Sequence, residues 1–440
     1  MKISDYPKFE SALSQGRPIT FLCGAGLSVS LGDHAKGWGG WLKEGKACLS
    51  DVEAEELDRR FGSYSASELI DAASFLIEAL RKNGNYTAYM DSTIGSLRVQ
   101  NKKLANALAL FVRCGDYFAT TNYDKLLEEV TGLGYYTYNM PGKIVQMLSG
   151  QAEMSVIHLH GIYDAATNMD DIVADQKQYE DVLANQGAQF IQNLISTCTL
   201  VILGCGTTVD DPNLKGFMSF ASKQLHLNIP YFYLHKAGDD LSDLGPNVIP
   251  VCYGMEYSDL SNAVEDMANY RIRTRYRDSG IIRVNPYVKT RKSFTASYRL
   301  HYLNEFCKFV GREKELVELN NFCSADKEVL WWSLVGKGGI GKSRLVYQWL
   351  KQLSNNWFGF FAKTDVDVER YREFKPFSDT VIVIDYVLGN EDKCATIVTT
   401  LFERFEYSRF KLRLLFVDRR YQNNENNWYD RIVGKMDMQM

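Results

Sequence analysis

Short apolar runs alternate with helical stretches along most of this 440-residue chain. In the first part of the chain such runs predict strands at 19–23, 117–121, 156–160, 200–204, 231–234 and 248–253. Between them, apolar residues recur at helical spacing over 66–80, 103–112 and 179–195. A strand that is apolar throughout is buried on both faces, which requires helices on both sides of a parallel sheet. The pattern therefore predicts an α/β fold with a doubly wound, Rossmann-type parallel sheet.

The composition fits a folded protein of the cytoplasm. Hydrophobic residues make up 45% of the chain and charged residues 24%, as in ordinary globular domains. The net charge of −4 argues against a surface coated with basic residues for nucleic acid. No apolar run reaches the roughly 18 residues of a membrane span, and residues 1–17 lack the apolar core of a secretory signal. We therefore expect a cytoplasmic protein that binds neither a membrane nor nucleic acid.

The cysteines predict neither zinc nor disulfides. Nine are present, and no two of them form a C-x-x-C pair. Structural zinc sites typically use such pairs, and an odd number of cysteines gives no disulfide framework.

The sequence divides into three parts, which we predict as a domain over 1–270, a basic linker over 271–304 and a second domain over 305–440. From 271 to 299 the chain has nine Lys and Arg residues against one acid, Asp278. Aromatic residues lie between these charges, so a nucleic-acid patch is an alternative. Charge runs are usually solvated segments, and we therefore favour a connector.

Residues 336–343 read G-K-G-G-I-G-K-S and match the P-loop, G-x-x-x-x-G-K-[ST], at every fixed position. Its glycines allow a tight turn whose N–H groups face a phosphate, and the next helix adds its positive dipole end. These glycines are Gly336, Gly338, Gly339 and Gly341. We predict that Lys342 binds the outer phosphates of ATP or ADP and that Ser343 reaches Mg²⁺. With predicted strands only at 329–335, 380–384 and 412–417, we expect this P-loop domain to be truncated.

A second element of the nucleotide site is the apolar run at 381–384, which ends in Asp385. After a P-loop this pattern is typical of a Walker B strand, and we predict that Asp385 reaches Mg²⁺ through water. The next residue is Tyr386 rather than a second acid, and only the more distant Glu391 is a candidate base for hydrolysis. The sequence therefore favours nucleotide binding over fast turnover.

Two further segments of the second domain resemble a known family. Residues 309–316 read F-V-G-R-E-K-E-L, and 414–420 read L-L-F-V-D-R-R. They resemble the F-x-G-R-x-x-E-L motif and the sensor strand of STAND NTPases, the signal-transduction ATPases that include NLR immune receptors. The resemblance covers about 305–440, without the family's winged-helix and C-terminal sensor regions. It implies that Arg312 contacts the nucleotide base and that Arg419 or Arg420 faces the phosphates.

Segments of glycine and polar residues lie at the ends of four predicted strands in the first domain. They are Gly24, Ala25, Gly26 and Ser28; Thr121, Asn122 and Asp124; His158, His160 and Gly161; and Gly204, Gly206 and Thr207, with D-P-N at 211–213. The carboxyl ends of parallel strands meet at one edge of a sheet, where doubly wound folds bind their ligands. Four such segments therefore predict one site.

In this order, GAGxS, T-x-N-x-D, L-H-G and a G-x-[GS]-x element before D-P-N resemble the sirtuin fold. They are most similar to the bacterial sirtuin-like NAD-consuming effectors of antiphage defence, as in Thoeris and in Avs-type proteins that join a sirtuin domain to a STAND module. The resemblance covers about 15–265. It implies that the turn at Gly24, Ala25, Gly26 and Ser28, with Thr121, holds the NAD⁺ diphosphate side, and that Gly204, Gly206 and Thr207 line the adenosine side.

The same resemblance assigns catalytic roles. Asn122 would contact the nicotinamide-side ribose and position water, Asp124 would support that loop, and His160 would act as general base. His158 shares a strand face with His160 and is the alternative base, although the position of His160 next to Gly161 favours His160. Trp38 and Trp41 either contact the ligand or, as we favour, pack their loop onto the domain.

Departures from the family narrow the function. The four-cysteine zinc module of deacetylating sirtuins is missing, which argues against a peptide deacylase, and Gly206 replaces the usual serine. We therefore predict an NAD⁺ hydrolase (NADase) of antiphage defence, in which a phage protein triggers the STAND module and its homo-oligomer depletes NAD⁺ in abortive infection. Hydrolysis and cyclisation of the product both stay open. The alternative is a regulatory scaffold that binds NAD⁺ or an ADP-ribose derivative without turnover.

Overall fold

A computed structural model gives the fold of the chain. It describes residues 1–440 apart from 16, 61–65, 186–194, 196–197, 206–229, 242–243, 245–246, 278–279, 288–300, 355–356, 375, 377, 407, 409, 421, 424–425, 428–429, 431 and 433–440. Among the described residues, no helix is long and apolar enough to cross a membrane.

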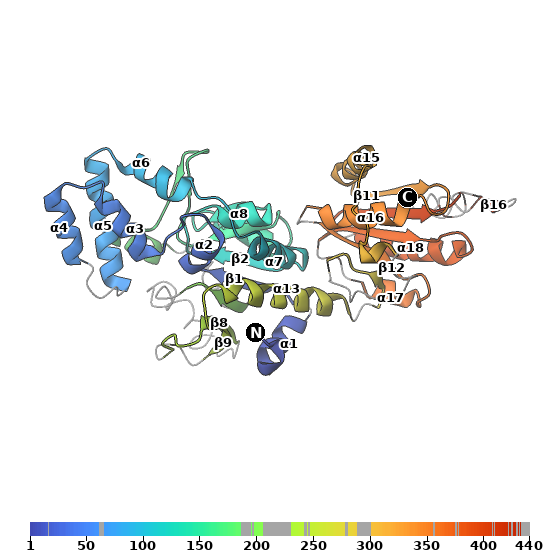
Figure 1. Cartoon of the computed structure of the whole chain (residues 1–440), viewed down its shortest axis with the longest axis horizontal. Helices are drawn as coiled ribbons and strands as arrows, with labels where there is room; N and C mark the ends of the chain where they lie inside the picture. The colour runs from blue at the N-terminus through green and yellow to red at the C-terminus, as the bar shows by residue number, and fades with distance from the viewer. Residues whose placement is uncertain are drawn as a thin grey trace. The chain divides into compact units, whose positions relative to one another are not determined.

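The described residues form two compact units. The first unit comprises Met1–Val112 and Asp116–Ala268, and the second comprises Arg113–Gly115 and Asn269–Met440. Each unit is built around its own sheet (Figure 1).

The first unit contains a seven-stranded sheet in the order β3-β4-β2-β1-β7-β8-β9. Its strands are β1 (Ile19–Cys23), β2 (Tyr117–Thr120), β3 (Gly134–Thr137), β4 (Ser155–His158), β7 (Thr199–Leu203), β8 (Tyr231–Lys236) and β9 (Val248–Gly254). Every pairing is parallel. The central strand β1 is buried along its whole length, as its sequence I-T-F-L-C predicts. The predicted Rossmann-type α/β fold is thus confirmed for this unit.

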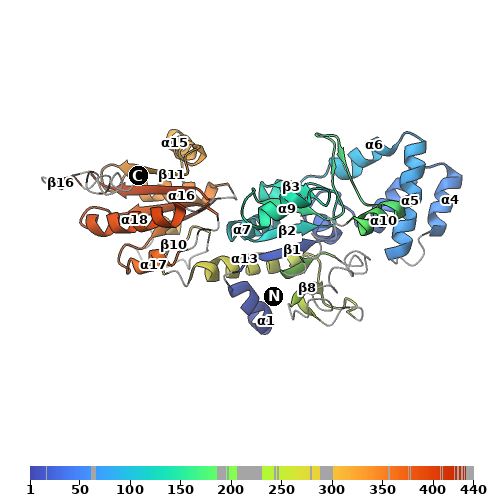
Figure 2. The same cartoon turned by 180° about the vertical axis from the view of Figure 1, so that it is seen from behind.

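Helices cover the sheet and extend beyond it. They are α1 (Pro7–Ser14), α2 (Ala25–Leu31), α3 (Trp38–Lys46), α4 (Asp51–Arg60), α5 (Ala66–Lys82), α6 (Tyr86–Met90), α7 (Lys102–Arg113), α8 (Leu126–Thr131), α9 (Pro141–Leu148), α10 (Gln176–Ala184) and α13 (Asp259–Arg277). Short elements are the helical turns Ile3–Asp5 and Asp91–Gly95 and the hairpin of β5 (Tyr163–Asp164) and β6 (Met169–Asp170). In Figure 2, helix α9 lies beside strand β3, with which it is in contact.

Helices α3 to α6 form a subdomain between β1 and β2 in sequence, drawn in blue at one end of the unit in Figure 1. Its apolar cluster includes Trp41, Leu76 and Tyr89, all buried, and Tyr123 and Tyr163 from the sheet side join it. The predicted helix at 66–80 is α5, whose regular apolar spacing faces this cluster. The subdomain therefore has a core of its own that reaches the carboxyl edge of the sheet.

The second unit contains a five-stranded sheet in the order β10-β12-β13-β14-β11. Its strands are β10 (Ile282–Val284), β11 (Val329–Val335), β12 (Trp357–Ala362), β13 (Asp379–Asp385) and β14 (Leu412–Asp418), with a separate hairpin of β15 (Gln422–Asn423) and β16 (Asn426–Asn427). Only β10 is antiparallel among the five paired strands described here. The helices are α15 (Glu313–Ser324), α16 (Lys342–Gln352), α17 (Glu369–Arg372) and α18 (Glu391–Glu406), with a turn at Tyr302–Asn304.

Three strands of the two larger sheets escaped the sequence prediction, as did the short hairpins β5–β6 and β15–β16. The strand β3 reads G-Y-Y-T and lies at an edge of its sheet, so it lacks the apolar run of a buried strand. The strand β12 reads W-F-G-F-F-A and is fully buried, but aromatic residues and a central glycine made it less distinct than an aliphatic run. The strand β10 lies inside the segment read as a basic linker, where α13 also extends to Arg277. Residues 288–300 of that segment lie outside the described part of the chain.

Candidate functional sites

In the first unit, the turn after β1 packs closely against the end of β7. Gly24 N donates to Leu203 O at 2.9 Å, and Gly26 N donates to Gly204 O at 2.8 Å. A Cβ at Gly26 would lie 2.9 Å from Gly204 O, and a Cβ at Gly204, where φ is +65°, would lie 2.3 Å from Leu27 N. Only glycine allows this contact between two backbones. The two N–H groups donate within the protein, so the main effect of these glycines is to fix the shape of the turn.

Asn122 is held at this edge by its own amide. Its Nδ2 donates to Gly24 O at 2.9 Å and to Ser28 Oγ at 2.8 Å, and its backbone N donates to Thr120 Oγ1 at 3.0 Å. Both N–H bonds of the amide are therefore used. Within the described part of the chain, its Oδ1 makes no hydrogen bond, and the residue is only half-buried. Oδ1 is thus positioned to accept a hydrogen bond from water or a ligand hydroxyl.

Asp124 holds Ser28 and the start of α8 in place through its two carboxylate oxygens. Its Oδ2 accepts from Ser28 Oγ at 2.7 Å, and its Oδ1 accepts from Leu126 N at 3.0 Å at the start of α8. Burial raises the pKa of the Asp124 carboxyl, and the hydrogen bonds from Ser28 and Leu126 lower it in part. The structure thus joins Ser28, Asn122 and Asp124, which were all predicted site residues, in one chain of hydrogen bonds.

A buried histidine lies beneath the same loop. His158 Nδ1 is 3.0 Å from Asn122 O, and His158 Nε2 is 2.8 Å from Glu128 Oε1. Burial alone would lower the pKa of His158, but the Glu128 carboxylate and the hydrogen bonds to Glu128 and Asn122 raise it above its ordinary value. Both ring nitrogens are engaged, so His158 positions the Asn122 loop and is poorly placed to take a proton from a ligand.

Glu128 escaped the sequence prediction. It lies on α8, and its i, i+4 spacing from Asp124 is the sequence signal from which it could have been predicted. Its side chain is 7% exposed, and its second oxygen, Oε2, is buried without a hydrogen bond. A carboxylate that is buried and half-satisfied is costly unless a charged partner compensates it, and His158 is that partner.

His160 lies beyond the end of β4 and is buried, with 2% exposed. Its carbonyl accepts from Val173 N at 2.7 Å, and its ring meets that of Tyr179 edge-on with centroids 5.3 Å apart. The following Gly161 has φ of +74°, and a Cβ there would lie 1.9 Å from Asp171 O. This glycine therefore allows the chain to turn sharply directly after His160. The predicted role of His160 as base stays a prediction.

A hollow at this edge is lined by Ala25, Ser28, Thr121, Asn122 and Asp124 together with Trp38 and Trp41. Its other lining residues, which sequence reasoning missed, are His34, Ala35, Lys36, Glu44, Thr93, Ile94, Leu97 and Tyr123. Trp41 Nε1 donates to Thr93 Oγ1 at 3.2 Å, which ties it to the subdomain, whereas Trp38 is only half-buried and lies 6.2 Å from the Tyr123 ring. Trp41 thus packs its helix, and Trp38 stands at the hollow.

The hollow is small, with a volume of about 50 Å³. Small-molecule sites usually measure about 300–1,000 Å³. The hollow is therefore smaller than a usual ligand site. Gly206 and Thr207, predicted on the adenosine side, lie outside the described residues, as does the D-P-N segment. His160 is not among the residues that line this hollow.

The second unit places its predicted phosphate loop between β11 and α16. Gly339 and Gly341 have φ of +81° and +90°, which favours glycine at both positions. Lys342 Nζ donates to Gly336 O at 2.5 Å and to Lys337 O at 3.0 Å, so the loop carbonyls satisfy its ammonium. Burial lowers the pKa of this lysine, and the Asp385 carboxylate opposes that shift.

Asp385 ends β13 directly beside this loop. Its Oδ2 accepts from Ser343 Oγ at 3.2 Å and from Arg283 Nη2 at 3.0 Å. Burial raises the pKa of Asp385, while the charge of Arg283 lowers it in part. A hydroxyl and a carboxylate that meet at the start of a helix are oxygen ligands of the kind Mg²⁺ prefers, so Ser343 and Asp385 fit the predicted metal.

A cavity of about 440 Å³ opens over these residues, within the usual range for small ligands. Gly338, Gly339, Lys342 and Arg419 line it. Further lining residues that sequence reasoning missed come from a segment just before α15 and include His301, Tyr302 and Phe306.

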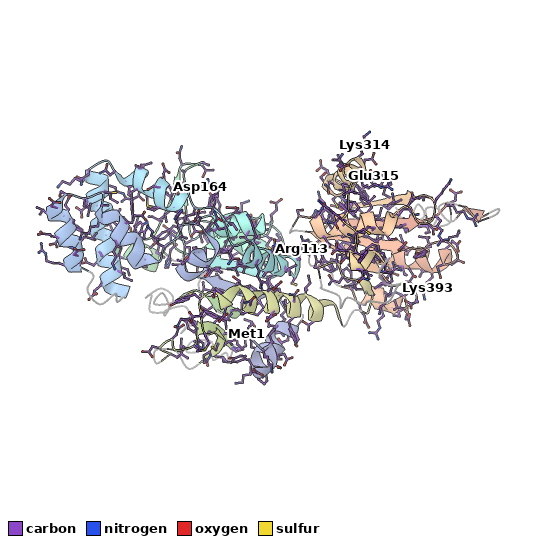
Figure 3. The ribbon with its side chains drawn as sticks, viewed as in Figure 1. Met1, Arg113, Asp164, Lys314, Glu315 and Lys393 are labelled. Carbon is purple, nitrogen blue, oxygen red and sulfur yellow. The ribbon has the colours of Figure 1, made fainter. Side chains whose placement is uncertain are left out.

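The two predicted arginines Arg312 and Arg419 differ in their relation to the cavity. Arg312 Nη2 donates to Ile340 O at 2.8 Å, and its Nη1 donates to Glu315 Oε1 at 2.5 Å on α15, where Figure 3 labels Glu315. Arg312 is not among the residues that line the cavity, whereas Arg419 is. Arg420 is exposed. Of the two arginines proposed for the phosphates, Arg419 therefore has the better position.

Comparison with known families adds one finding. Residues 116–244 match the family model of the SIR2-like domain. The chain carries a SIR2-like domain in this region. The matched segment runs from β2 to just beyond β8 and includes Asn122, Asp124, His158, His160 and Gly204. The sirtuin-like part of the sequence resemblance is thereby confirmed for this segment. The match leaves out the Gly24–Ser28 turn and the whole P-loop unit.

Proposed function

We propose that the first unit is an NAD⁺ glycohydrolase. The observation that carries this proposal is the hydrogen-bonded chain of Ser28, Asn122 and Asp124, which holds the Asn122 amide at the ligand edge of a SIR2-like domain. A polar group held in one orientation lowers the cost of positioning a reactant. Asn122 Oδ1 is left to accept a hydrogen bond from the attacking water or from a ribose hydroxyl.

The proposed reaction breaks the bond between nicotinamide nitrogen and ribose C1′. The bonding electron pair leaves with nicotinamide, which becomes a neutral molecule. Water oxygen forms the new bond to C1′, and its proton passes to His160, as a neutral imidazole allows near pH 7. The products are ADP-ribose, nicotinamide and a proton. Trp38 and α3 would close over the nicotinamide side and limit the access of bulk water.

We propose that the second unit binds ATP or ADP with Mg²⁺ and controls the first. The support is the P-loop between β11 and α16, with Asp385 at hydrogen-bond distance from Ser343 and a cavity of suitable size. The resemblance to STAND modules extends this to a defence protein whose homo-oligomer forms on contact with a phage protein and depletes NAD⁺ in abortive infection. Nucleotide state and trigger would bias an equilibrium between an inactive and an active form.

The products test the first proposal. The purified chain is incubated with NAD⁺, ATP and Mg²⁺, and the mixture is separated by chromatography. We expect nicotinamide and ADP-ribose in equal amounts; cyclic ADP-ribose would indicate cyclisation instead of hydrolysis. Unchanged NAD⁺, both with the purified chain and in phage-infected cells that produce it, would contradict the proposal.

A second candidate function, binding of NAD⁺ without turnover, is favoured by the place of His160 outside the hollow. The hollow at Asn122 holds only about 50 Å³, and His160 is not among its lining residues. A scaffold that binds NAD⁺ or ADP-ribose without turnover requires no base beside Asn122. Calorimetry with ADP-ribose separates the two, because a scaffold would bind the ligand tightly and leave NAD⁺ intact in the same preparation.

A further inference from the structure

In the second unit, the side chain of Arg283 forms an ion pair with Asp385, the carboxylate that we predict for the Mg²⁺ site. Arg283 Nη2 lies 3.0 Å from Asp385 Oδ2, the same oxygen that accepts from Ser343 Oγ at 3.2 Å. The Asp385 side chain is 4% exposed and that of Arg283 is 36% exposed. The ion pair is therefore shielded on the carboxylate side and open to solvent on the arginine side.

The fold fixes Arg283 in this place. It lies in β10 between Ile282, which pairs with Ala362, and Val284, which pairs with Phe361 on β12. Lys363 N donates to Ile281 O at 2.7 Å, which extends the contact at this end of the strand. The guanidinium lies 5.7 Å from the Phe361 ring centroid, a distance at which the ring stabilises a cation. The strand thus holds the guanidinium over the end of the neighbouring sheet strands.

A guanidinium and a magnesium ion cannot share one carboxylate oxygen without strong repulsion. Two positive charges near each other in a partly buried site repel more strongly than they would in water. The water molecules that Mg²⁺ retains in its octahedral shell need acceptors such as Asp385 Oδ2, and the guanidinium of Arg283 already donates to that oxygen. Metal binding at Asp385 therefore requires Arg283 to move.

We propose that Arg283 is the built-in counter-ion of Asp385, which Mg²⁺ has to displace when nucleotide binds. This inference rests on the proposed nucleotide function of the second unit. In the metal-free state Arg283 keeps the carboxylate paired and the site assembled. When Mg²⁺ takes its place, Arg283 is released on an edge strand held to the sheet on one side only. The metal-loaded state therefore differs from the metal-free state at β10, a strand with no part in the P-loop sequence motif.

Binding of a fluorescent nucleotide measures this competition. The full chain is titrated with Mg²⁺ in the presence of mant-ADP, and anisotropy reports the Mg²⁺ concentration at half-effect. Loss of one charge-assisted contact corresponds to about tenfold in affinity. We expect Arg283→Ala to lower the half-effect Mg²⁺ concentration about tenfold and to leave mant-ADP affinity in EDTA within about twofold of the parent. Arg283→Lys keeps the charge and should lie between the two.

A matched control is Arg372→Ala, because Arg372 is an exposed arginine of the same unit whose partner, Glu369, lies on its own short helix. It should behave as the parent does. Thermal melts of each variant show whether the second unit stays folded. Mn²⁺ binding followed by electron paramagnetic resonance, without nucleotide, gives a second readout and should also tighten in Arg283→Ala.

Three results would overturn the inference. An unchanged or higher half-effect Mg²⁺ concentration in Arg283→Ala, with mant-ADP still bound, would show that Arg283 does not compete with the metal. Weaker mant-ADP binding in EDTA would make Arg283 a phosphate ligand instead. If the parent binds mant-ADP no better than Lys342→Ala under any condition, the proposed nucleotide function itself fails, and the inference fails with it.

Discussion

The two candidate sites satisfy their polar groups in opposite ways. Around Asn122, side chains bond to one another through Ser28, Asp124 and the loop backbone, and the remaining hollow measures about 50 Å³. Around Lys342, the groups suited to phosphate and metal contact substitutes, namely loop carbonyls and Arg283, beneath a cavity of about 440 Å³. The first site is built to hold one residue still. The second has a cavity over its internal contacts, which the proposed nucleotide would replace.

This difference predicts which substitutions should change the free energy of unfolding and which should change ligand affinity. In the first unit, removing a supporting residue leaves a buried partner unsatisfied, so changes there should affect both stability and chemistry. In the second unit, the proposed nucleotide would replace the internal contacts, so changes there should affect affinity more than folding. The predictions below test that division in order of decreasing expected effect.

The largest effect should come from the predicted base. His160→Ala should lower the rate of nicotinamide release about 10²–10⁴-fold, because a positioned base contributes about that much. His158→Gln should have a smaller effect on the rate, since both of its ring nitrogens are engaged inside the protein. Initial rates at saturating NAD⁺ decide between them. A larger loss for His158→Gln than for His160→Ala would assign the base to His158.

The buried pair beneath Asn122 should dominate stability in the first unit. Glu128→Ala removes the partner of His158 and should lower the free energy of unfolding by about 3 kcal/mol, the cost of breaking a buried pair. Urea unfolding followed by circular dichroism measures it. Glu78→Ala is the control, because Glu78 is exposed on helix α5 of the same unit. Equal effects of the two substitutions would show that the pair contributes nothing specific.

The P-loop lysine should affect affinity alone. Lys342→Ala should weaken mant-ATP binding about 100-fold, because a phosphate then loses its charged partner. The melting temperature should change little, since Lys342 contacts only loop carbonyls in the unliganded site. Lys327→Ala, at an exposed position of the same unit, is the control. A large loss of stability in Lys342→Ala would contradict the contrast between the sites.

A smaller effect is expected at the packed turn of the first unit. Gly26→Ala places a Cβ 2.9 Å from Gly204 O and should cost about 1–3 kcal/mol, as overpacking usually does. Gly37→Ala is the matched control, because a Cβ there has nothing within 4 Å. Thermal unfolding of both variants tests the point. A neutral Gly26→Ala would show that the turn and β7 separate easily.

The smallest effect is a dependence of stability on pH. The pKa of His158 is raised in the folded state by Glu128 in spite of burial, so its contribution is complete below the unfolded value of about 6.5 and is lost as the pH rises through the folded value. The raised pKa of Asp124, caused first by burial, acts with the same sign at lower pH. The melting temperature of the first unit should therefore fall as the pH rises above about 6.5. His158→Gln should flatten this slope, and an unchanged slope would exclude His158 as its source.

Much of the fold was predictable because buried aliphatic strands have a strong sequence signal. Six strands of the first sheet were predicted from such runs, whereas β3 was missed because tyrosines at a sheet edge resemble a loop. The glycines and the Asn122 segment were also predictable, since they follow strands that end at one edge. The Glu128–His158 pair was not, because pairing between α8 and β4 depends on tertiary packing.

The same limit applies to the second unit. Lys342, Ser343 and Asp385 were predictable because their spacing belongs to a local motif. Arg283 was read as one charge in a basic linker, because nothing local shows that β10 brings it to a carboxylate 102 positions further along the chain. Hydrogen-bond partners that are distant in the sequence are thus the features of a site that are hardest to predict from the sequence.

NAD⁺ consumption tests the central claim most directly. The purified chain and its Asn122→Ala variant are compared with ATP and Mg²⁺ present, with melting curves to show that both are folded. The account predicts that NAD⁺ is lost and nicotinamide released by the parent alone. Equal NAD⁺ loss in the two proteins, or intact NAD⁺ with the parent both in purified form and in phage-infected cells, would contradict it.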